Sequence, residues 1–323
     1  MPQPTLTAAL QNCRRDWDGA IADFDRALQF DPKLAQAYDN RGDAKTETGD
    51  FDGAIADFNR ALQLNPKYAK AYDNRGLAKL SRGDLDGAMA DFNRALQFDP
   101  KLAPAYEARG VVKEQKGELD GAIADCNRAI ELNPKLAGAY LNRGIAKAYK
   151  GDTDNAIADF NRALQLNPKL APAYAGHGSA NFLAHNWTAA LQGYRRFCEL
   201  SQRNQAYPRL FIWIIRSRLG EREAADKELA THFNAEPGTW VSKVATYLLG
   251  NLSEVELFTA AASPDANTDR GQHCEAWFYA GMKNVLGDDK WAAAQFFKKC
   301  LATGQKNAVE YHFAKEELNA LGQ

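Results

Sequence analysis

Apolar residues recur at helical spacing along most of the chain, in pairs of short segments with a glycine between them. In the best-defined pair the segments cover about 69–81 and 85–98. Ala88, Phe92 and Ala95 fall on one face of the second segment, which predicts a helix that buries this face. The pattern therefore predicts pairs of amphipathic helices joined by tight turns.

The ends of these helices carry their own signals. Asp84 follows the turn residue Gly83 and can cap the second helix by accepting backbone N–H groups. Pro100 disfavours helix at the residue before it, so the second helix should end by Asp99. Gly76 stands in mid-helix, where it costs about 1 kcal/mol relative to alanine. We expect that two helices approach closely there, with the small residues of the second helix facing Gly76.

The helix pair repeats every 34 residues, which is the mark of a stacked repeat protein. Tyrosine, glycine and proline each return at this spacing, the tyrosines being Tyr38, Tyr72, Tyr106, Tyr140 and Tyr174. The predicted units are a partial, atypical one at 1–34, four clear ones at 35–68, 69–102, 103–136 and 137–170, and a degrading one at 171–204. A C-terminal helical domain with degenerate repeat-like helices is expected over 205–323.

The repeated residues resemble the tetratricopeptide repeat. The matching residues of one unit are Tyr72, Gly76, Ala88, Phe92, Ala95 and Pro100. The resemblance implies an all-α, right-handed superhelix whose first helices line a concave face. It also implies a non-enzymatic protein-interaction scaffold that binds a peptide or a partner helix there. The chain departs from the family at the seventh position of each unit, which carries Arg41, Arg75, Arg109 and Arg143, and at the eleventh, which carries Lys45, Lys79, Lys113 and Lys147.

Composition excludes several classes of partner. The 40 basic and 41 acidic residues give a formal net charge of −1, which offers no electrostatic footprint for nucleic acid or an anionic membrane. No apolar run approaches the roughly 18 residues of a transmembrane helix. The first ten residues lack a signal-peptide pattern, so a cytoplasmic location is expected for the chain as given, and a periplasmic one if a signal was trimmed. The five cysteines are odd in number and widely spaced, so we do not expect a disulfide framework.

The last third of the chain has a second resemblance. Residues Ala276–Gln323 are similar to the C-terminus of the bacterial new lipoprotein I family, through an aromatic pair before a glycine, a Gly-Asp turn and a Val-Glu-aromatic ending. Members of that family act as cell-envelope adaptors that present partners to a protease or to murein hydrolases, and they can form homodimers. The chain lacks the lipidated cysteine of those proteins.

We find no convincing catalytic or cofactor motif. His312 and Glu316 lie four residues apart, a spacing that can place two metal ligands on one helix face, but no third ligand accompanies them. We therefore expect no enzyme activity, no cofactor and no metal.

The repeated charges suggest a ladder of ion pairs. Each arginine at position 7 has an aspartate in the second helix of its unit: Asp57, Asp91, Asp125 and Asp159. Because both recur with one period, a pair formed once is formed in every unit. The alternative is a basic stripe that binds an acidic peptide, and the equally periodic aspartates argue against it.

The candidate binding residues lie on the first helices. Asn40, Asn74 and Asn142 form a row at position 6, which Ala108 interrupts. Such a row resembles the asparagine ladders with which some tetratricopeptide arrays hold a peptide backbone, since an amide both donates and accepts. The alternative, equally weighted, is that these asparagines only bond neighbouring helices. The other candidates are Asp39, Asp73, Glu107, Leu77, Val111, Ile145, Tyr149 and Phe182, acidic toward the N-terminal end and apolar toward the C-terminal end.

Overall fold

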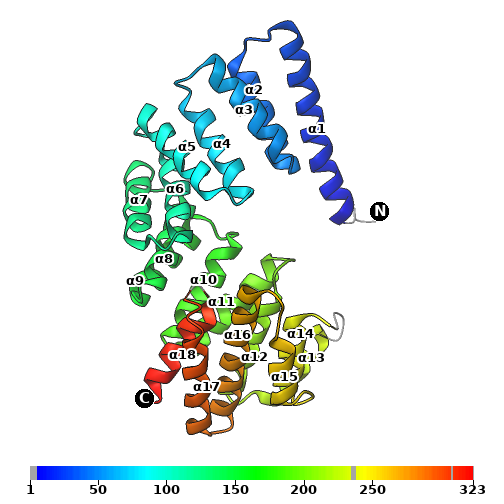
Figure 1. The fold of residues 1–323 in the computed structure, drawn as a ribbon, viewed down its shortest axis with the longest axis vertical. Coiled ribbons are helices and arrows are strands. Elements are labelled where there is room, and N and C mark those ends of the chain that lie inside the picture. Colours follow the sequence, from blue (N-terminus) through cyan, green and yellow to red (C-terminus); the bar gives the residue numbers. More distant parts are fainter. Residues whose placement is uncertain (1–5, 234–237, 307, 323) are drawn as a thin grey trace. The chain divides into compact units, whose positions relative to one another are not determined.

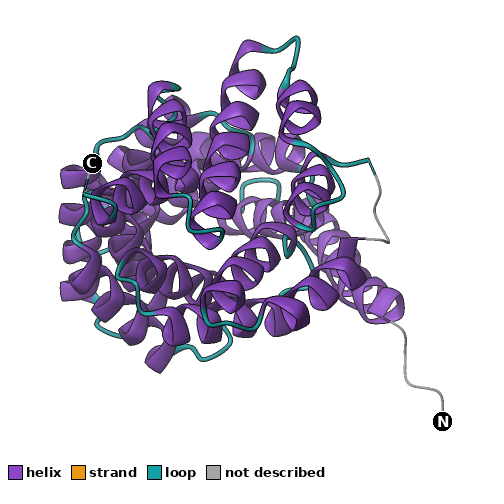
Figure 2. Ribbon diagram, turned by 90° about the horizontal axis from the view of Figure 1, so that it is seen from below, coloured by secondary structure: helices purple, strands orange, loops and turns teal. Residues whose placement is uncertain are grey.

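The computed structural model describes residues 6–233, 238–306 and 308–322, with side chains from residue 17 onward. These residues form eighteen α-helices joined by short loops, and no strand occurs among them (Figure 2). The predicted all-α solenoid fold is thus confirmed.

The chain divides into two compact units, Met1–Lys150 and Gly151–Gln323. Each is described by itself. In the first unit, successive helices stack against one another along the chain (Figure 1). Its helices are α1 (Leu6–Phe30), α2 (Ala35–Thr48), α3 (Phe51–Leu64), α4 (Ala69–Ser81), α5 (Leu85–Phe98), α6 (Ala103–Gln115), α7 (Leu119–Leu132) and α8 (Ala137–Tyr149).

The helix bounds follow the predicted signals. Helices α4 and α5 begin and end where the apolar pattern places them. The Asp84 carboxylate caps α5 by accepting the Gly87 N–H at 2.9 Å. Gly83 adopts φ +80° in the turn, a conformation that L-residues rarely adopt. Residues 6–30, where a partial repeat was predicted, form one continuous helix.

Gly76 marks a close approach between the two helices of its unit, as expected, but the facing group differs from the prediction. A Cβ atom at Gly76 would lie 2.7 Å from Cε1 of Phe92, which is fully buried. The glycine therefore makes room for the Phe92 ring rather than for the neighbouring alanines. Gly42 faces Phe58 in the preceding unit in the same way, at 2.6 Å.

The second unit packs around one large aromatic core. Six consecutive residues of α12, from Leu210 to Ile215, are buried, so this helix is packed on all sides. Trp291, by contrast, is 75% exposed. The helices are α9 (Thr153–Leu166), α10 (Ala171–Leu183), α11 (Trp187–Leu200), α12 (Ala206–Arg218), α13 (Arg222–Phe233), α14 (Trp240–Leu248), α15 (Glu254–Ala261), α16 (Ala266–Leu286), α17 (Lys290–Ala302) and α18 (Val309–Ala320).

The helices of 171–204 share this core. Phe182 of α10 lies 4.6 Å, centroid to centroid, from Phe313 of α18, and Tyr194 of α11 stacks on Phe211 at 5.4 Å. The degrading repeat therefore packs with the C-terminal helices. The second compact unit accordingly begins at Gly151, and the separate C-terminal domain expected over 205–323 stays a prediction.

Helices α16 and α17 repeat the packing of the earlier units. A Cβ at Gly281 would lie 2.4 Å from Cε1 of Phe297, and the two residues are separated by the same 16 positions as Gly76 and Phe92. The same helix pair brings together two buried cysteines that are far apart in sequence: Cys274 Sγ and Cys300 Sγ lie 2.9 Å apart as free thiols.

Candidate peptide-binding face

The first helices of the repeats form one continuous layer in the first unit. Helices α2, α4, α6 and α8 each contact the next member of this series directly. Within the described residues, α3, α5 and α7 do not contact one another to a similar extent. Helices that approach more closely lie on the inner side of a curved stack, so this layer has the place that the resemblance assigns to a ligand. We call it the first-helix face and define it by Asp39, Asn40, Asp43, Asp73, Asn74, Leu77, Glu107, Val111, Asn142, Ile145 and Tyr149.

The predicted ladder of arginine–aspartate pairs is present behind this face. Arg75 donates to both oxygens of Asp91, from Nε at 2.8 Å and from Nη2 at 2.5 Å. Lys79 Nζ lies 2.8 Å from the same carboxylate, so each aspartate is held by two cations. The units on either side repeat the arrangement with Arg41, Lys45 and Asp57, and with Arg109, Lys113 and Asp125.

Each of these arginines also connects neighbouring repeats. Arg75 Nη1 donates to Asn59 Oδ1 of the preceding unit at 2.6 Å, and its guanidinium lies 5.3 Å from the ring centroid of Tyr72. The arginine side chains are therefore engaged inside the stack, which contradicts the basic-stripe alternative. The fourth pair, Arg143 with Asp159, joins residues of different units and stays a prediction.

The asparagine row makes contacts between repeats. Asn74 Nδ2 donates to Asp39 Oδ1 at 3.0 Å, and Asn142 Nδ2 lies at 3.5 Å from Glu107 Oε1. In both cases the asparagine of one repeat meets the acid of the repeat before it. Asn40 makes no hydrogen bond with the described side chains. The structural interpretation thus holds for Asn74, and a ligand ladder would have to break that bond.

Asp39 is completely buried and fully satisfied. Besides Asn74, it accepts the Tyr68 hydroxyl at 3.1 Å, and Lys70 Nζ lies 3.3 Å from its Oδ2. Burial, helped by the charge of Asp39, raises the pKa of Tyr68 to about 12. Burial acts to lower the pKa of Lys70, but the charges of Asp39 and Asp43 outweigh it and raise this pKa. Sequence reasoning missed Tyr68 and Lys70 as partners because they lie at the start of α4, Tyr68 as its N-cap residue and Lys70 in its first turn.

Asp73 occupies the same position one repeat later and is not satisfied. It is 5% exposed, and its Oδ1 has no hydrogen-bond partner among the described residues. Burial raises the pKa of Asp73 to about 7, and the nearby charges of Asp43 and Glu107 add to this effect. Burial likewise raises the pKa values of Asp43 and Glu107. The N-terminal half of the face therefore concentrates carboxylates that are costly to ionise.

The apolar candidates divide between two places. Leu77, one turn after Asp73, is 40% exposed, and Val111, Ile145 and Tyr149 are half-buried on α6 and α8. Phe182 is not a face residue. It is 1% exposed in the core of the second unit, wedged against Phe211 and Phe313, so it leaves the candidate set.

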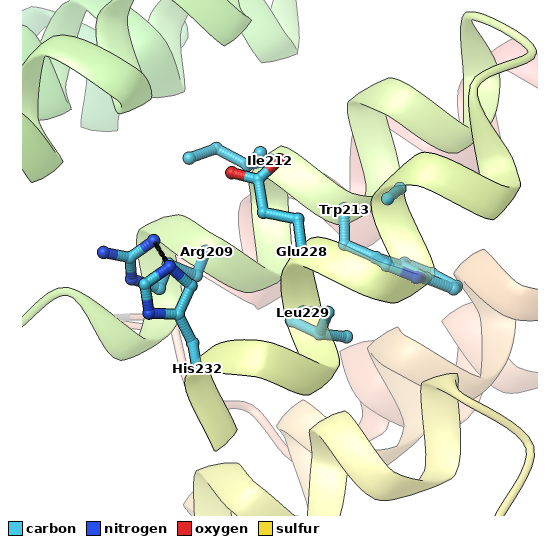
Figure 3. A pocket seen from close by; sticks show the side chains of 7 residues that line it. Arg209, Ile212, Trp213, Glu228, Leu229 and His232 are labelled. Carbon is cyan, nitrogen blue, oxygen red and sulfur yellow. Dashed lines mark hydrogen bonds between the residues drawn. The ribbon is translucent and has the colours of Figure 1, made fainter. Parts of the chain in front are cut away.

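A small pocket lies between α12 and α13 in the second unit (Figure 3). Arg209 and His232 face each other at one end of it and are hydrogen-bonded. Burial and the charge of Arg209 lower the pKa of His232. The cavity volume of ≈ 10 Å³ has room for about one water molecule, which excludes an organic ligand without rearrangement.

The described residues offer no metal site and no membrane span. His312 Nε2 contacts the Lys306 carbonyl at 2.7 Å, and no group of three or more His, Cys, Asp or Glu side chains in the described part of the chain could hold a metal ion. None of the described helices is both long and apolar enough to cross a bilayer.

Comparison with family models agrees with the repeat pattern. A model described as a TPR repeat matches residues 42–81, 76–117 and 114–151, and one described as a tetratricopeptide repeat matches 137–170. Residues 42–170 are therefore tetratricopeptide repeats.

Solved structures with this fold include several repeat proteins. PilF of Pseudomonas aeruginosa is 18% identical with a TM-score of 0.58, over 64% of this chain and 94% of that chain. PilW, described as a type IV pilus biogenesis factor, is 22% identical with a TM-score of 0.57, over 63% of this chain and 96% of that chain. The Cut9–Hcn1 assembly of the APC/C is 17% identical with a TM-score of 0.57, over 95% of this chain and 53% of that chain. At these identities the likeness concerns the fold alone.

Proposed function

We propose that this protein is a non-enzymatic interaction scaffold that binds an extended peptide or a partner helix on its first-helix face. The supporting observation is a contrast in how polar groups are satisfied. Behind the face, three arginine–lysine–aspartate sets are fully paired. On the face, Asp73 keeps a buried oxygen without a partner and Leu77, one turn away, stays exposed. A stack that only needed to be stable would gain free energy if a donor were bonded to the Asp73 oxygen and if Leu77 were covered by other side chains.

The face suits a peptide because it offers both polar and apolar side chains, with the acids toward its N-terminal helices and the apolar residues toward its C-terminal ones. Acidic side chains occupy α2, α4 and α6, while apolar side chains occupy α4, α6 and α8. Asn40, which has no described side-chain partner, is available to bond a peptide unit, whereas Asn74 is engaged with Asp39. The proposed ligand-facing residues are therefore Asn40, Asp73, Leu77, Glu107, Val111, Ile145 and Tyr149.

Selection from a random peptide library displayed on phage, with the full chain as target, tests this proposal. Hydrogen–deuterium exchange with a selected peptide then locates the contact. We expect slower exchange in α4 and α6 and unchanged exchange in α5 and α7. Failure to select any peptide, or protection confined to the second unit, would contradict the proposal.

The resemblance of Ala276–Gln323 to new lipoprotein I predicts a narrower role, as a cell-envelope adaptor. It also predicts that the protein can form homodimers. Cell fractionation with an antibody against the protein tests the former: recovery from the periplasm or envelope supports it, and recovery from the cytosol contradicts it. Sedimentation velocity of the purified chain tests the latter.

A further inference from the structure

The surroundings of Asp39 and Asp73 differ in one systematic way. Asp39 takes its donors from α4 and the residue that caps it: the Tyr68 hydroxyl, the Lys70 ammonium and the Asn74 amide. Thirty-four residues further on, where Asp73 needs the same donors, the chain has residues whose side chains donate nothing. They are Leu102, Pro104 and Ala108.

Without these three donors, Asp73 is a buried carboxylate that lacks a hydrogen-bond partner among the described residues. Its Oδ1 is buried and unpartnered, although Asp73 lies on the same face as the satisfied Asp39. Leaving a buried carboxylate oxygen without a donor costs free energy that any cation placed there would recover. Since the chain itself supplies no such donor within the described residues, an external group is the remaining source.

The preceding repeat shows which group fits. Lys70 Nζ lies between two carboxylates, 3.3 Å from Asp39 Oδ2 and 3.3 Å from Asp43 Oδ2. The carboxylates whose charges act most strongly on Asp73 are Asp43 of α2 and, next, Glu107 of α6. The described hydrogen bond of Glu107, to the amide of Asn142, is 3.5 Å long, at the outer limit of a hydrogen bond.

We propose that the site formed by Asp73, Glu107, Leu77 and Val111 binds the ammonium or guanidinium group of a lysine or arginine side chain from the peptide partner. The inference rests on the proposed function and names the chemistry of its ligand. Asp73 and Glu107 hold the cation as Asp39 and Asp43 hold Lys70. Leu77 and Val111, each one turn beyond its acid, contact the aliphatic stem of the ligand's side chain.

The chemistry of the site favours this occupant over others. The absence of any three-ligand cluster among the described residues argues against a metal ion. An exposed leucine beside the carboxylate matches a side chain with an apolar stem better than it matches a small inorganic cation. The carboxylates would repel acidic peptides.

A titration with matched small probes tests the site directly. The ¹⁵N-labelled full chain is titrated with N-acetyl-arginine methylamide and, separately, with N-acetyl-citrulline methylamide, its neutral isostere. We expect saturable shifts of the amide signals of α4 and α6 with the arginine probe. The affinity for the citrulline probe should be weaker by roughly tenfold or more, because a charge-assisted hydrogen bond changes a binding constant by about that factor.

Two variants separate the site from general electrostatics. Asp73→Asn removes the carboxylate, and Ala108→Asn keeps it but offers it an internal donor like Asn74. Both should weaken binding of the arginine probe by roughly tenfold. Asp154→Asn, which removes an exposed aspartate from α9, is the matched control and should leave binding unchanged.

The opposite results overturn the inference. Equal affinity for the two probes, no saturable shift with either, or an Ala108→Asn variant that binds like wild type would each exclude a cation site at Asp73. Exchange protection of α4 and α6 by a library-selected peptide would stand in any of these cases, so loss of this inference is distinguishable from loss of the proposed function.

Discussion

At the residue scale, the most informative group is a carboxylate whose surroundings changed between repeats. Asp73 is buried like Asp39 but lacks its donors. Its raised pKa has a direct consequence for stability, because the folded state holds the proton over a pH range in which the unfolded chain releases it. The groups that set this pKa are Asp43 and Asp39 on α2, Glu107 on α6 and, in the opposite sense, Lys70 on α4.

The first prediction is a pH-dependent gain from Asp73→Asn. Below the unfolded pKa of about 4, Asp73 is protonated in both states and contributes no penalty. The penalty grows as the pH rises toward the folded value of about 7 and is complete above it. Urea unfolding of wild type and variant should therefore show a difference in unfolding free energy that favours the variant more at about pH 8 than at about pH 5, by roughly 1–3 kcal/mol. The same difference in unfolding free energy at both pH values would show that the pKa of Asp73 is not raised in the folded state.

The second prediction is that Ala108→Asn stabilises the protein. The new amide would occupy the place that Asn74 has beside Asp39, at 3.0 Å, and would donate to the unpartnered oxygen of Asp73. We expect a gain in unfolding free energy of roughly 0.5–2 kcal/mol, since hydrogen bonds to charged groups exceed the helix propensity lost from alanine. In the Asp73→Asn background the gain should vanish; a gain of equal size there would contradict the assigned contact.

At the element scale, the pairs α2/α3 and α4/α5 are each held by a ring against a glycine and by an aspartate shared between two cations. Sequence reasoning placed α4 and α5 at their observed bounds because period, cap and terminating proline are all local signals. It could not identify Phe92 as the neighbour of Gly76, because which side chain faces a glycine depends on the rotation of the second helix. It also missed that Asp39 is satisfied from the next repeat, since that contact depends on the register between units.

The third prediction concerns the glycine contact. Gly76→Ala should destabilise the protein by roughly 1–3 kcal/mol, because the added methyl must displace the buried Phe92 ring. Gly19→Ala on α1, where nothing lies within 4 Å of the new Cβ, is the matched control and should stabilise by roughly 0.5–1 kcal/mol. Thermal melts compare the two, and equal shifts of the melting temperature would contradict the close-contact assignment.

The fourth prediction concerns the ion-pair ladder. Asp91→Ala leaves Arg75 and Lys79 without their carboxylate in a half-buried interface, so we expect a loss of roughly 2–4 kcal/mol in urea unfolding. Asp86→Ala, on the same helix, removes the exposed pair with Lys116 and should shift the midpoint little. A comparable loss in both variants would indicate that the ladder contributes no more than a surface pair.

At the scale of the whole molecule, the chain couples a regular repeat unit to a second unit with one large core. Residues 42–170 follow one tetratricopeptide pattern, which made the fold class predictable from the sequence. The packing of 171–204 with the C-terminal helices was not predictable. It arises because Phe182 and Tyr194 find their partners in Phe211 and Phe313, which lie beyond the end of the repeat pattern.

The residues of the first-helix face were predictable in part for the same reason. The period placed Asp73, Leu77, Glu107 and Val111 on successive first helices, and the structure keeps them there. Phe182 does not lie on this face. Its repeat position resembles a face position, but its side chain is buried in the core of the second unit. Repeat position thus predicts orientation only as long as the neighbouring units continue the stack.

The most direct test of the account is the affinity of a library-selected peptide for two matched variants, measured by isothermal titration calorimetry. Leu77 and Leu219 are exposed to 40% and 41%, but only Leu77 lies on the first-helix face. We predict that Leu77→Arg raises the dissociation constant of the peptide by roughly tenfold or more, as expected for a contact worth about 1.4 kcal/mol. Leu219→Arg should leave the dissociation constant within about twofold of the wild-type value. Equal affinities for both variants and wild type, or a loss confined to Leu219→Arg, would contradict binding on the first-helix face.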